Sequence, residues 1–118
     1  TRTMKTLLLY ILVHATVYNA VPNQTDSTPL ITASNKKIDA DNPGKHRWLA
    51  VSRDLEAFGF TFGAEVCVEN AGKMNGIWTV EDRMNKRFVF TIDFLVDNEI
   101  VLGKWRNVKI SLNKNRND

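Results

Sequence analysis

The sequence predicts a small, mainly β barrel that forms a single domain. From residue 47 onward, apolar and polar residues alternate in short segments, which is typical of half-buried strands. Six or seven such strands with little helix indicate a β-barrel. An internal echo points the same way, because Phe62-Gly63 and Leu102-Gly103 each lead into a strand with two aliphatic residues on one face. A strand-loop-strand unit used twice would give a barrel with pseudo-twofold symmetry.

Length and composition fit one globular domain. The chain has 118 residues, of which 43% are hydrophobic and 25% charged, and its formal net charge is +3. The basic residues are scattered, which favours a solvated surface and argues against nucleic acid as a partner. The single cysteine, Cys67, rules out an internal disulfide, and His14 and His46 lack metal-ligand spacing. We therefore expect a monomer without metal or cofactor.

Residues 1–15 allow two interpretations. Arg2 and Lys5 precede an apolar run at residues 7–13, and Val13-His14-Ala15 has small residues where a signal peptidase reads, which indicates a secretory signal. The competing interpretation is the start of a first strand over residues 10–20. The run is too short to cross a membrane as a helix, so no stable membrane span is expected.

The remaining elements follow from alternation and turn signals. Residues 21–47 form a polar, turn-rich loop with a short apolar strand inside it, and such loops often line a site. Further strands are expected over residues 47–52, 64–69, 77–82, 88–95 and 105–112, followed by a polar tail at 113–118.

Individual residues predict where short helices begin and end, where a hairpin turns, and which side chains share one face of a strand. Ser52 can begin a short helix over residues 53–58 that Gly59 ends, and residues 97–102 suggest a helical turn. Asn75-Gly76 indicates a hairpin. The alternation over residues 88–95 places Phe88, Phe90, Ile92 and Phe94 on one face, with Asp93 on the other.

Two carboxylates mark a candidate site. Asp82 and Asp93 lie eleven residues apart, each after a β-like run, with the polar turn Asn85-Lys86-Arg87 between them. Acids at the ends of paired strands can share one cleft, and a carboxylate pair is the commonest equipment for cutting a glycosidic bond. The competing interpretation is structural, with Asp82 satisfying turn donors and Asp93 a solvated outward residue or an ion-pair partner.

The order of the segments resembles that of the three-aspartate domain, a double-psi β-barrel related to rare lipoprotein A and to the barrel of membrane-bound lytic transglycosylase A. The resemblance implies a six-stranded double-psi β-barrel over residues 16–112 with one or two short helices. It runs through Ala15-Thr-Val-Tyr18, Ile31-Thr-Ala-Ser34, Leu49-Ala-Val-Ser52, Phe62-Gly63, Glu65-Val-Cys-Val, Trp78-Thr-Val-Glu-Asp82, Thr91-Ile-Asp93-Phe-Leu, Gly103-Lys-Trp105 and Val108-Lys-Ile110.

Three positions depart from the family pattern. Ser52 stands where the family usually has an aspartate, and Asp54 is the nearest possible replacement. The segment 83–87 replaces a glycine-rich turn, and Asn35 stands where a glycine is usual. The family's fold is still expected despite these departures, but they weaken the inference that this chain shares the family's substrate contacts.

The resemblance implies a peptidoglycan-cleaving enzyme of lytic transglycosylase type. Its partner would be the glycan strand, cut between N-acetylmuramic acid and N-acetylglucosamine, and its location the cell envelope, periplasmic or secreted. Asp93 would be the acid and base, and Asp82 the partner that orients it or stabilises positive charge. The alternative is a non-catalytic glycan-binding barrel, which the missing acid at Ser52 favours.

Substrate contacts are assigned by position. Tyr18 and Thr32 are candidates for sugar contacts, and Asp26 is a further one that also serves, with Asp54, as a fallback acid. Trp105 lies between two basic residues and is a candidate for stacking on a sugar, whereas the other two tryptophans lie in apolar strands and are expected in the core.

Overall fold

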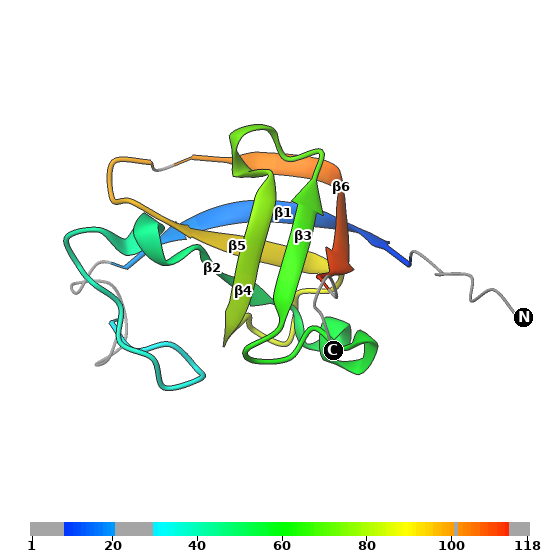
Figure 1. Cartoon of the computed structure of the whole chain (residues 1–118), viewed down its shortest axis with the longest axis horizontal. Helices are drawn as coiled ribbons and strands as arrows, with labels where there is room; N and C mark the ends of the chain where they lie inside the picture. Colours follow the sequence, from blue (N-terminus) through cyan, green and yellow to red (C-terminus); the bar gives the residue numbers. More distant parts are fainter. Residues whose placement is uncertain (1–8, 21–29, 101, 114–118) are drawn as a thin grey trace, which may run out of the picture.

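Six strands close into one barrel in the computed structural model, which describes residues 9–20, 30–100 and 102–113 (Figure 1). The strands are β1 Ile11–Asn19, β2 Trp48–Val51, β3 Glu65–Glu69, β4 Gly76–Arg83, β5 Thr91–Val96 and β6 Lys104–Leu112. Around the barrel their order is β1-β5-β2-β4-β3-β6. The described helices are three short 3₁₀ turns: η1 Pro43–His46, η2 Arg53–Phe58 and η3 Gly72–Met74. The mainly β, six-stranded prediction is confirmed.

The strand pairing repeats between the two halves of the chain. β1 is parallel to β5, and β4 is parallel to β2. β1 is antiparallel to β6, and β4 is antiparallel to β3. The contacts β2–β5 and β3–β6 are antiparallel as well. Exchanging β1 with β4, β2 with β5 and β3 with β6 leaves this pattern unchanged, which is the pseudo-twofold arrangement indicated by the internal echo.

The strands that carry the two acids do not pair with each other, which corrects the sequence prediction. β2 lies between β4 and β5 and pairs with both of them. The reason is visible directly after β4, where Met84 donates its N–H to the carbonyl of Val51 over 2.9 Å and is buried. The chain therefore crosses the end of β2 instead of turning straight back.

β5 is shorter at its start than the alternation predicts. Ile92 and Phe94 are fully buried as expected, but the strand begins at Thr91, and Phe90 is 42% exposed with a φ of 45°. Asp54 accepts the Phe90 N–H over 2.9 Å, which turns the chain out of the sheet before the strand begins. Of the predicted face of Phe88, Phe90, Ile92 and Phe94, only Ile92 and Phe94 therefore lie within the strand.

The core is built around Phe94. Its ring lies 4.6 Å from that of Trp78 and 5.8 Å from that of Trp105, measured between centroids. Trp78 is 2% exposed, and its indole N–H donates to the Met74 carbonyl over 2.7 Å, so its one polar atom is satisfied. A second, smaller apolar cluster of Ala20, Ile38 and Leu95 lies apart from this core.

The predicted helix and hairpin are present with altered detail. η2 covers residues 53–58, and Gly59 ends it with a φ of 101°, a value that favours glycine. Ser52 precedes it without a side-chain cap. β3 and β4 form the expected antiparallel pair, although η3 lies in their connection. Residues 97–100 make a single turn, closed by the Ile100 N–H on the Asp97 carbonyl.

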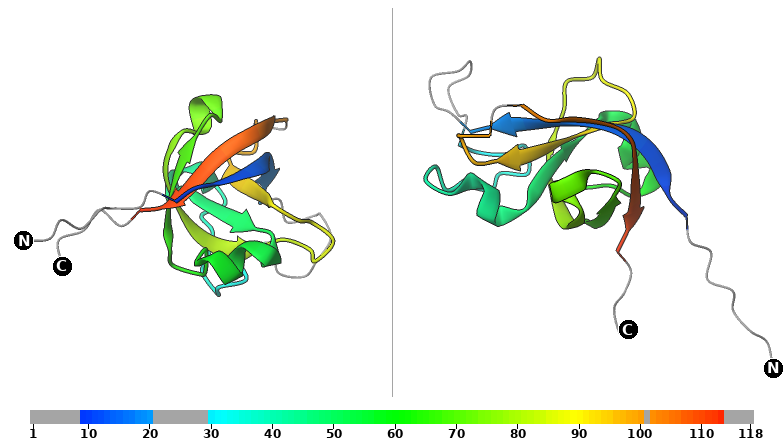
Figure 2. Two further views of the ribbon diagram at one scale, coloured as in Figure 1. Left: turned by 90° about the vertical axis from the view of Figure 1, so that its right-hand side faces the viewer. Right: turned by 90° about the horizontal axis from the view of Figure 1, so that it is seen from above.

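The N-terminal strand and the long loop follow the outline. Residues 11–19 form β1, while residues 1–8 of the possible signal segment, residues 21–29 and the tail 114–118 lie outside the described residues. Within the loop, the expected short strand is one bridge between Ile31 and Lys37. Figure 2 shows β1 and β6 bending together, and their register shifts between Val13 and Ala15. The part of the chain described here contains no helix of the length and apolarity that a bilayer crossing requires.

Replacing Phe94 by alanine should lower the free energy of unfolding by about 3–5 kcal/mol, because a fully buried ring between two tryptophans would leave a cavity. Phe58 is 54% exposed and provides the matched control, for which the same change should cost no more than about 1 kcal/mol. Urea unfolding followed by tryptophan fluorescence measures both. Equal losses in the two variants would contradict the proposed core.

Candidate functional site

Five residues form a row across five neighbouring strands, on the side of the sheet that faces away from the core. Lys104 of β6 lies opposite Thr16 of β1, which lies opposite Asp93 of β5. Asp93 lies opposite Ala50 of β2, and Ala50 also lies opposite Asp82 of β4. Paired residues on adjacent strands project to the same face. We call these five residues the cross-strand row.

Asp93 is the partly buried acid of the row. Its chain neighbours Ile92 and Phe94 point into the core, so Asp93 itself points outward. The Thr16 hydroxyl donates to Asp93 Oδ1 over 2.7 Å. The pKa of Asp93 is raised to about 6. Burial raises it most, the Thr16 hydrogen bond lowers it, and the negative charge of Asp82 raises it further. The Asp93 carboxyl can therefore hold or release a proton near neutral pH.

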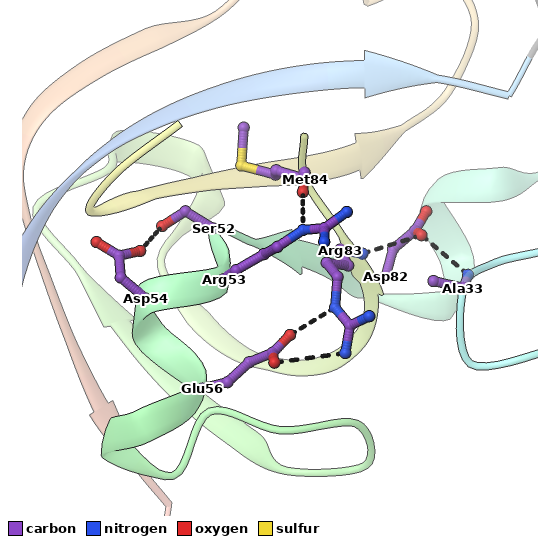
Figure 3. Close-up of polar contacts among 8 residues, drawn as sticks. All are labelled: Ala33, Ser52, Arg53, Asp54, Glu56, Asp82, Arg83 and Met84. Atoms are coloured by element: carbon purple, nitrogen blue, oxygen red, sulfur yellow. Dashed lines mark hydrogen bonds and ion pairs between the residues drawn. The ribbon is translucent and has the colours of Figure 1, made fainter. Parts of the chain in front are cut away.

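Asp82 is held by three hydrogen bonds. Its Oδ1 accepts the backbone N–H of Ala33 over 2.9 Å and that of Arg83 over 3.0 Å (Figure 3). Its Oδ2 accepts the Tyr18 hydroxyl over 3.1 Å. Burial, followed by the charge of Asp82, raises the pKa of Tyr18 well above its usual value, so Tyr18 stays a neutral donor. Asp82 is thus close enough to contact Tyr18 and to influence Asp93, and the roles of these three residues stay a prediction.

The loop that carries Thr32 is fastened to β4 beside Asp82. Ser34 donates its hydroxyl to Glu81 Oε1 over 2.6 Å, and the Thr32 and Ser34 hydroxyls are hydrogen-bonded over 2.9 Å. Thr32 is 4% exposed, and its hydroxyl also accepts the Lys36 N–H over 3.0 Å. Thr32 is therefore placed near Asp82, next to Ala33, and its hydroxyl is hydrogen-bonded within the loop.

Asn35 takes the left-handed backbone conformation, which favours glycine. Its φ is 72°, and asparagine tolerates this region better than other residues with a side chain. The loop can therefore take this conformation with an asparagine where the resemblance led us to expect a glycine.

Sequence reasoning missed three members of the row, Thr16, Lys104 and Ala50, and Ala50 is the one that lies between the two acids. It is 4% exposed, and it is the common pairing partner of Asp82 and Asp93. Under the pseudo-twofold exchange Ala50 corresponds to Asp93, and Thr16 corresponds to Asp82. The signal was present only as the small residue between Leu49 and Val51, which are both fully buried. A larger side chain here would intrude between the two acids.

Ser52 and Asp54 form a separate polar cluster. The Ser52 hydroxyl donates to Asp54 Oδ1 over 2.5 Å (Figure 3). Asp54 Oδ2 accepts the Phe90 N–H. Ser52 is fully buried and its hydroxyl also accepts the Thr91 N–H over 3.0 Å. Asp54 is therefore engaged in holding the start of β5, and in this arrangement it is not a member of the cross-strand row.

The remaining candidates lie elsewhere. Trp105 pairs with the fully buried Ala15 and packs its ring edge-on against Phe94, so it lies on the core side of the sheet, opposite to the row. Asp26 lies outside the described residues. Among the residues that the structure describes, no group of three or more histidine, cysteine or acidic side chains is arranged to hold a metal.

The raised pKa of Asp93 predicts a pH-dependent stability. An unfolded aspartate releases its proton near pH 4, whereas folded Asp93 does so near pH 6. The folded state binds more protons between these values, so the free energy of unfolding should fall as pH rises through this window. The difference between 3.8 and about 6 corresponds to at most about 3 kcal/mol, and partial exposure reduces it.

Asp93→Asn removes this titration. Urea unfolding of both proteins at pH 4 and pH 8 should show the variant gaining stability relative to wild type at the higher pH. A difference between the two proteins that is the same at both pH values would refute the raised pKa.

Comparison with known proteins bears on the fold. No known family model and no curated protein matches the sequence. Two solved structures are similar: an apo expansin from Clavibacter michiganensis, and an aspartate-to-asparagine mutant of Clavibacter michiganensis expansin in complex with cellohexaose. Their TM-scores are 0.55 and 0.56, and each is 14% identical over 93% of this chain. The alignment covers 53% of each expansin chain, so this chain spans about half their length. The shared fold is the double-psi β-barrel.

Proposed function

We propose that the protein cleaves peptidoglycan glycan strands as a lytic transglycosylase, with Asp93 serving as both acid and base. The observation that carries this proposal is a partly exposed carboxyl group with a pKa of about 6, hydrogen-bonded to Thr16 and influenced by the charge of Asp82. A general acid works best when its pKa lies near the operating pH. The resemblance to the three-aspartate domain supplies the substrate class.

The chemistry needs one proton to be given and one to be taken. Protonated Asp93 donates its proton to the glycosidic oxygen as the bond from C1 of N-acetylmuramic acid to that oxygen breaks. The leaving N-acetylglucosamine keeps the proton as a hydroxyl. The Asp93 carboxylate then takes the proton from the 6-hydroxyl of the same N-acetylmuramic acid while that oxygen bonds to C1. An anhydro sugar forms, no water is consumed, and Asp93 is returned in its protonated form.

Asp82 suits an electrostatic role in this scheme. Both of its oxygens already accept hydrogen bonds, from Ala33, Arg83 and Tyr18. A carboxylate held in this way is poorly placed to attack C1 as a nucleophile. Its negative charge raises the pKa of Asp93 and would stabilise positive charge that develops on the sugar.

This function places the protein outside the cytoplasmic membrane, in the cell envelope, the periplasm or the secreted fraction, where its substrate lies. Of the two interpretations of residues 1–15, the secretory signal agrees with this location, because such a signal would deliver the barrel there. Recovery of the intact chain only from the cytoplasm of its host would count against this location.

A non-catalytic glycan-binding barrel is the second candidate. It is favoured by the expansin neighbour, whose structure holds cellohexaose, and by Ser52 in place of an acid. The two candidates differ in their products. Incubation with purified peptidoglycan followed by mass analysis should yield anhydro-muropeptides from the enzyme, whereas a binder would sediment with the peptidoglycan and release nothing. Products with reducing ends would indicate a hydrolase instead.

Asp93→Asn should abolish cleavage while the fold and glycan binding remain. Asparagine keeps the shape and accepts the Thr16 hydrogen bond, but it cannot transfer a proton. General acid–base catalysis contributes roughly 10²–10⁴-fold, and one group acting twice should lie at the upper end. Asp82→Asn should cost less, because its role is electrostatic. The exposed loop residue Asp41 provides the matched control, and Asp41→Asn should keep wild-type activity.

Release of anhydro-muropeptides per unit time measures all three variants, and sedimentation with peptidoglycan measures their binding. Wild-type activity in Asp93→Asn would show that another acid performs the chemistry. A wild type that binds but never cleaves would establish the binding module.

A further inference from the structure

An open hollow lies at one end of the cross-strand row. Its volume is about 580 Å³, and its lining comprises Thr16, Val17, Leu102, Gly103 and Lys104. Thr16 belongs both to this lining and to the site, since its hydroxyl donates to Asp93 over 2.7 Å. The hollow and the Asp93 carboxyl therefore share one side chain as their boundary, and a ligand that reaches Asp93 can extend into the hollow.

The floor of the hollow depends on Gly103. A Cβ atom added there would lie 2.9 Å from Val17 Cγ1 and 2.9 Å from Trp105 Cη2, closer than such atoms approach in proteins. The backbone thus lies directly on the core, with no side chain of its own above it. Leu102 is 87% exposed, so the rim offers an apolar surface to a ligand. A hollow with an apolar lining suits one face of a sugar ring.

Lys104 supplies the charge of the hollow. It is exposed, and within the described part of the chain it has no carboxylate within ion-pair distance. It lies two strands from Asp93, a separation of about 10 Å between backbones. The row therefore presents a cation at one end and Asp82 with Asp93 toward the other. An anionic group bound in the hollow would meet Lys104 and remain apart from both acids.

We propose that the hollow is a subsite for a sugar residue that carries a carboxylate, with the carboxylate on the Lys104 ammonium group and the ring against Val17 and Leu102. The ligand class rests on the proposed function, because the glycan is taken from there. The new part of the proposal is that the ligand must carry a negative charge at this one position. A neutral β-glucan lacks such a charge. N-acetylmuramic acid with a free lactyl carboxylate has the required chemistry.

The test measures binding in the Asp93→Asn background, so that cleavage does not interfere. The probes are glycan strands of peptidoglycan freed from their peptide stems, and the same strands with every lactyl carboxylate converted to a methyl amide. The Asp93→Asn protein should bind the carboxylate form about two- to fivefold more tightly at low salt, the range of an exposed ion pair. The preference should fade at 1 M salt, where screening acts over about 3 Å.

Two charge reversals then locate the preference. Adding Lys104→Glu should abolish or invert it, whereas adding Lys86→Glu, which gives the same net charge from an exposed loop position, should retain it. Equal binding of both probes by the Asp93→Asn protein would overturn the subsite and leave glycan binding intact. Equal losses in the two lysine variants would also overturn it, because the effect would then come from overall charge. Binding of neither probe would overturn the subsite together with the proposed function.

Discussion

The candidate site depends on the register of β2. Its residue Ala50 is opposite Asp93 on one side and Asp82 on the other, so one backbone position sets the spacing of the two acids. Leu49 and Val51 on either side are fully buried and hold that register. A slip by one residue would turn both into solvent and Ala50 into the core, at the cost of two buried aliphatic side chains. The register of β2 therefore determines both the stability of the core and the geometry of the site.

The loop over residues 30–38 also helps to fix the position of Asp82. The register between β2 and β4 shifts between Leu49 and Ala50, which leaves Glu81 as an extra residue next to Asp82. Glu81 is 6% exposed, and Ser34 satisfies it with both a side-chain and a backbone hydrogen bond. Ala33 donates its backbone N–H to the Asp82 side chain. The irregular strand and the loop thus complete each other, and Asp82 is oriented by groups that lie far away in the sequence.

Local patterns carried most of the fold and part of the site. The strands and their buried faces were predictable because alternation is a property of a few consecutive residues, and Asp93 between Ile92 and Phe94 is the clearest case. Pairing was not predictable at β4 and β5, because a short connection looks like a hairpin whether or not another strand is inserted. The side of the sheet that Trp105 occupies could not be predicted either. Asn107 has a φ of 55°, and this break in the strand puts Trp105 on the same side as Val108 despite their odd spacing.

The pseudo-twofold pairing has a consequence for the direction of a bound chain. A barrel with two identical halves would offer a polysaccharide two equivalent orientations, because the axis passes between Asp93 and Ala50. The halves differ where it matters: Asp93 stands opposite Ala50, and Thr16 corresponds to Asp82. A glycan has a reducing end and a non-reducing end. Because the two halves of the barrel differ, the two orientations of a bound glycan would not be equivalent, and one would be preferred. If Asp93 is the proton donor, as proposed, a bound strand would approach it from one direction only.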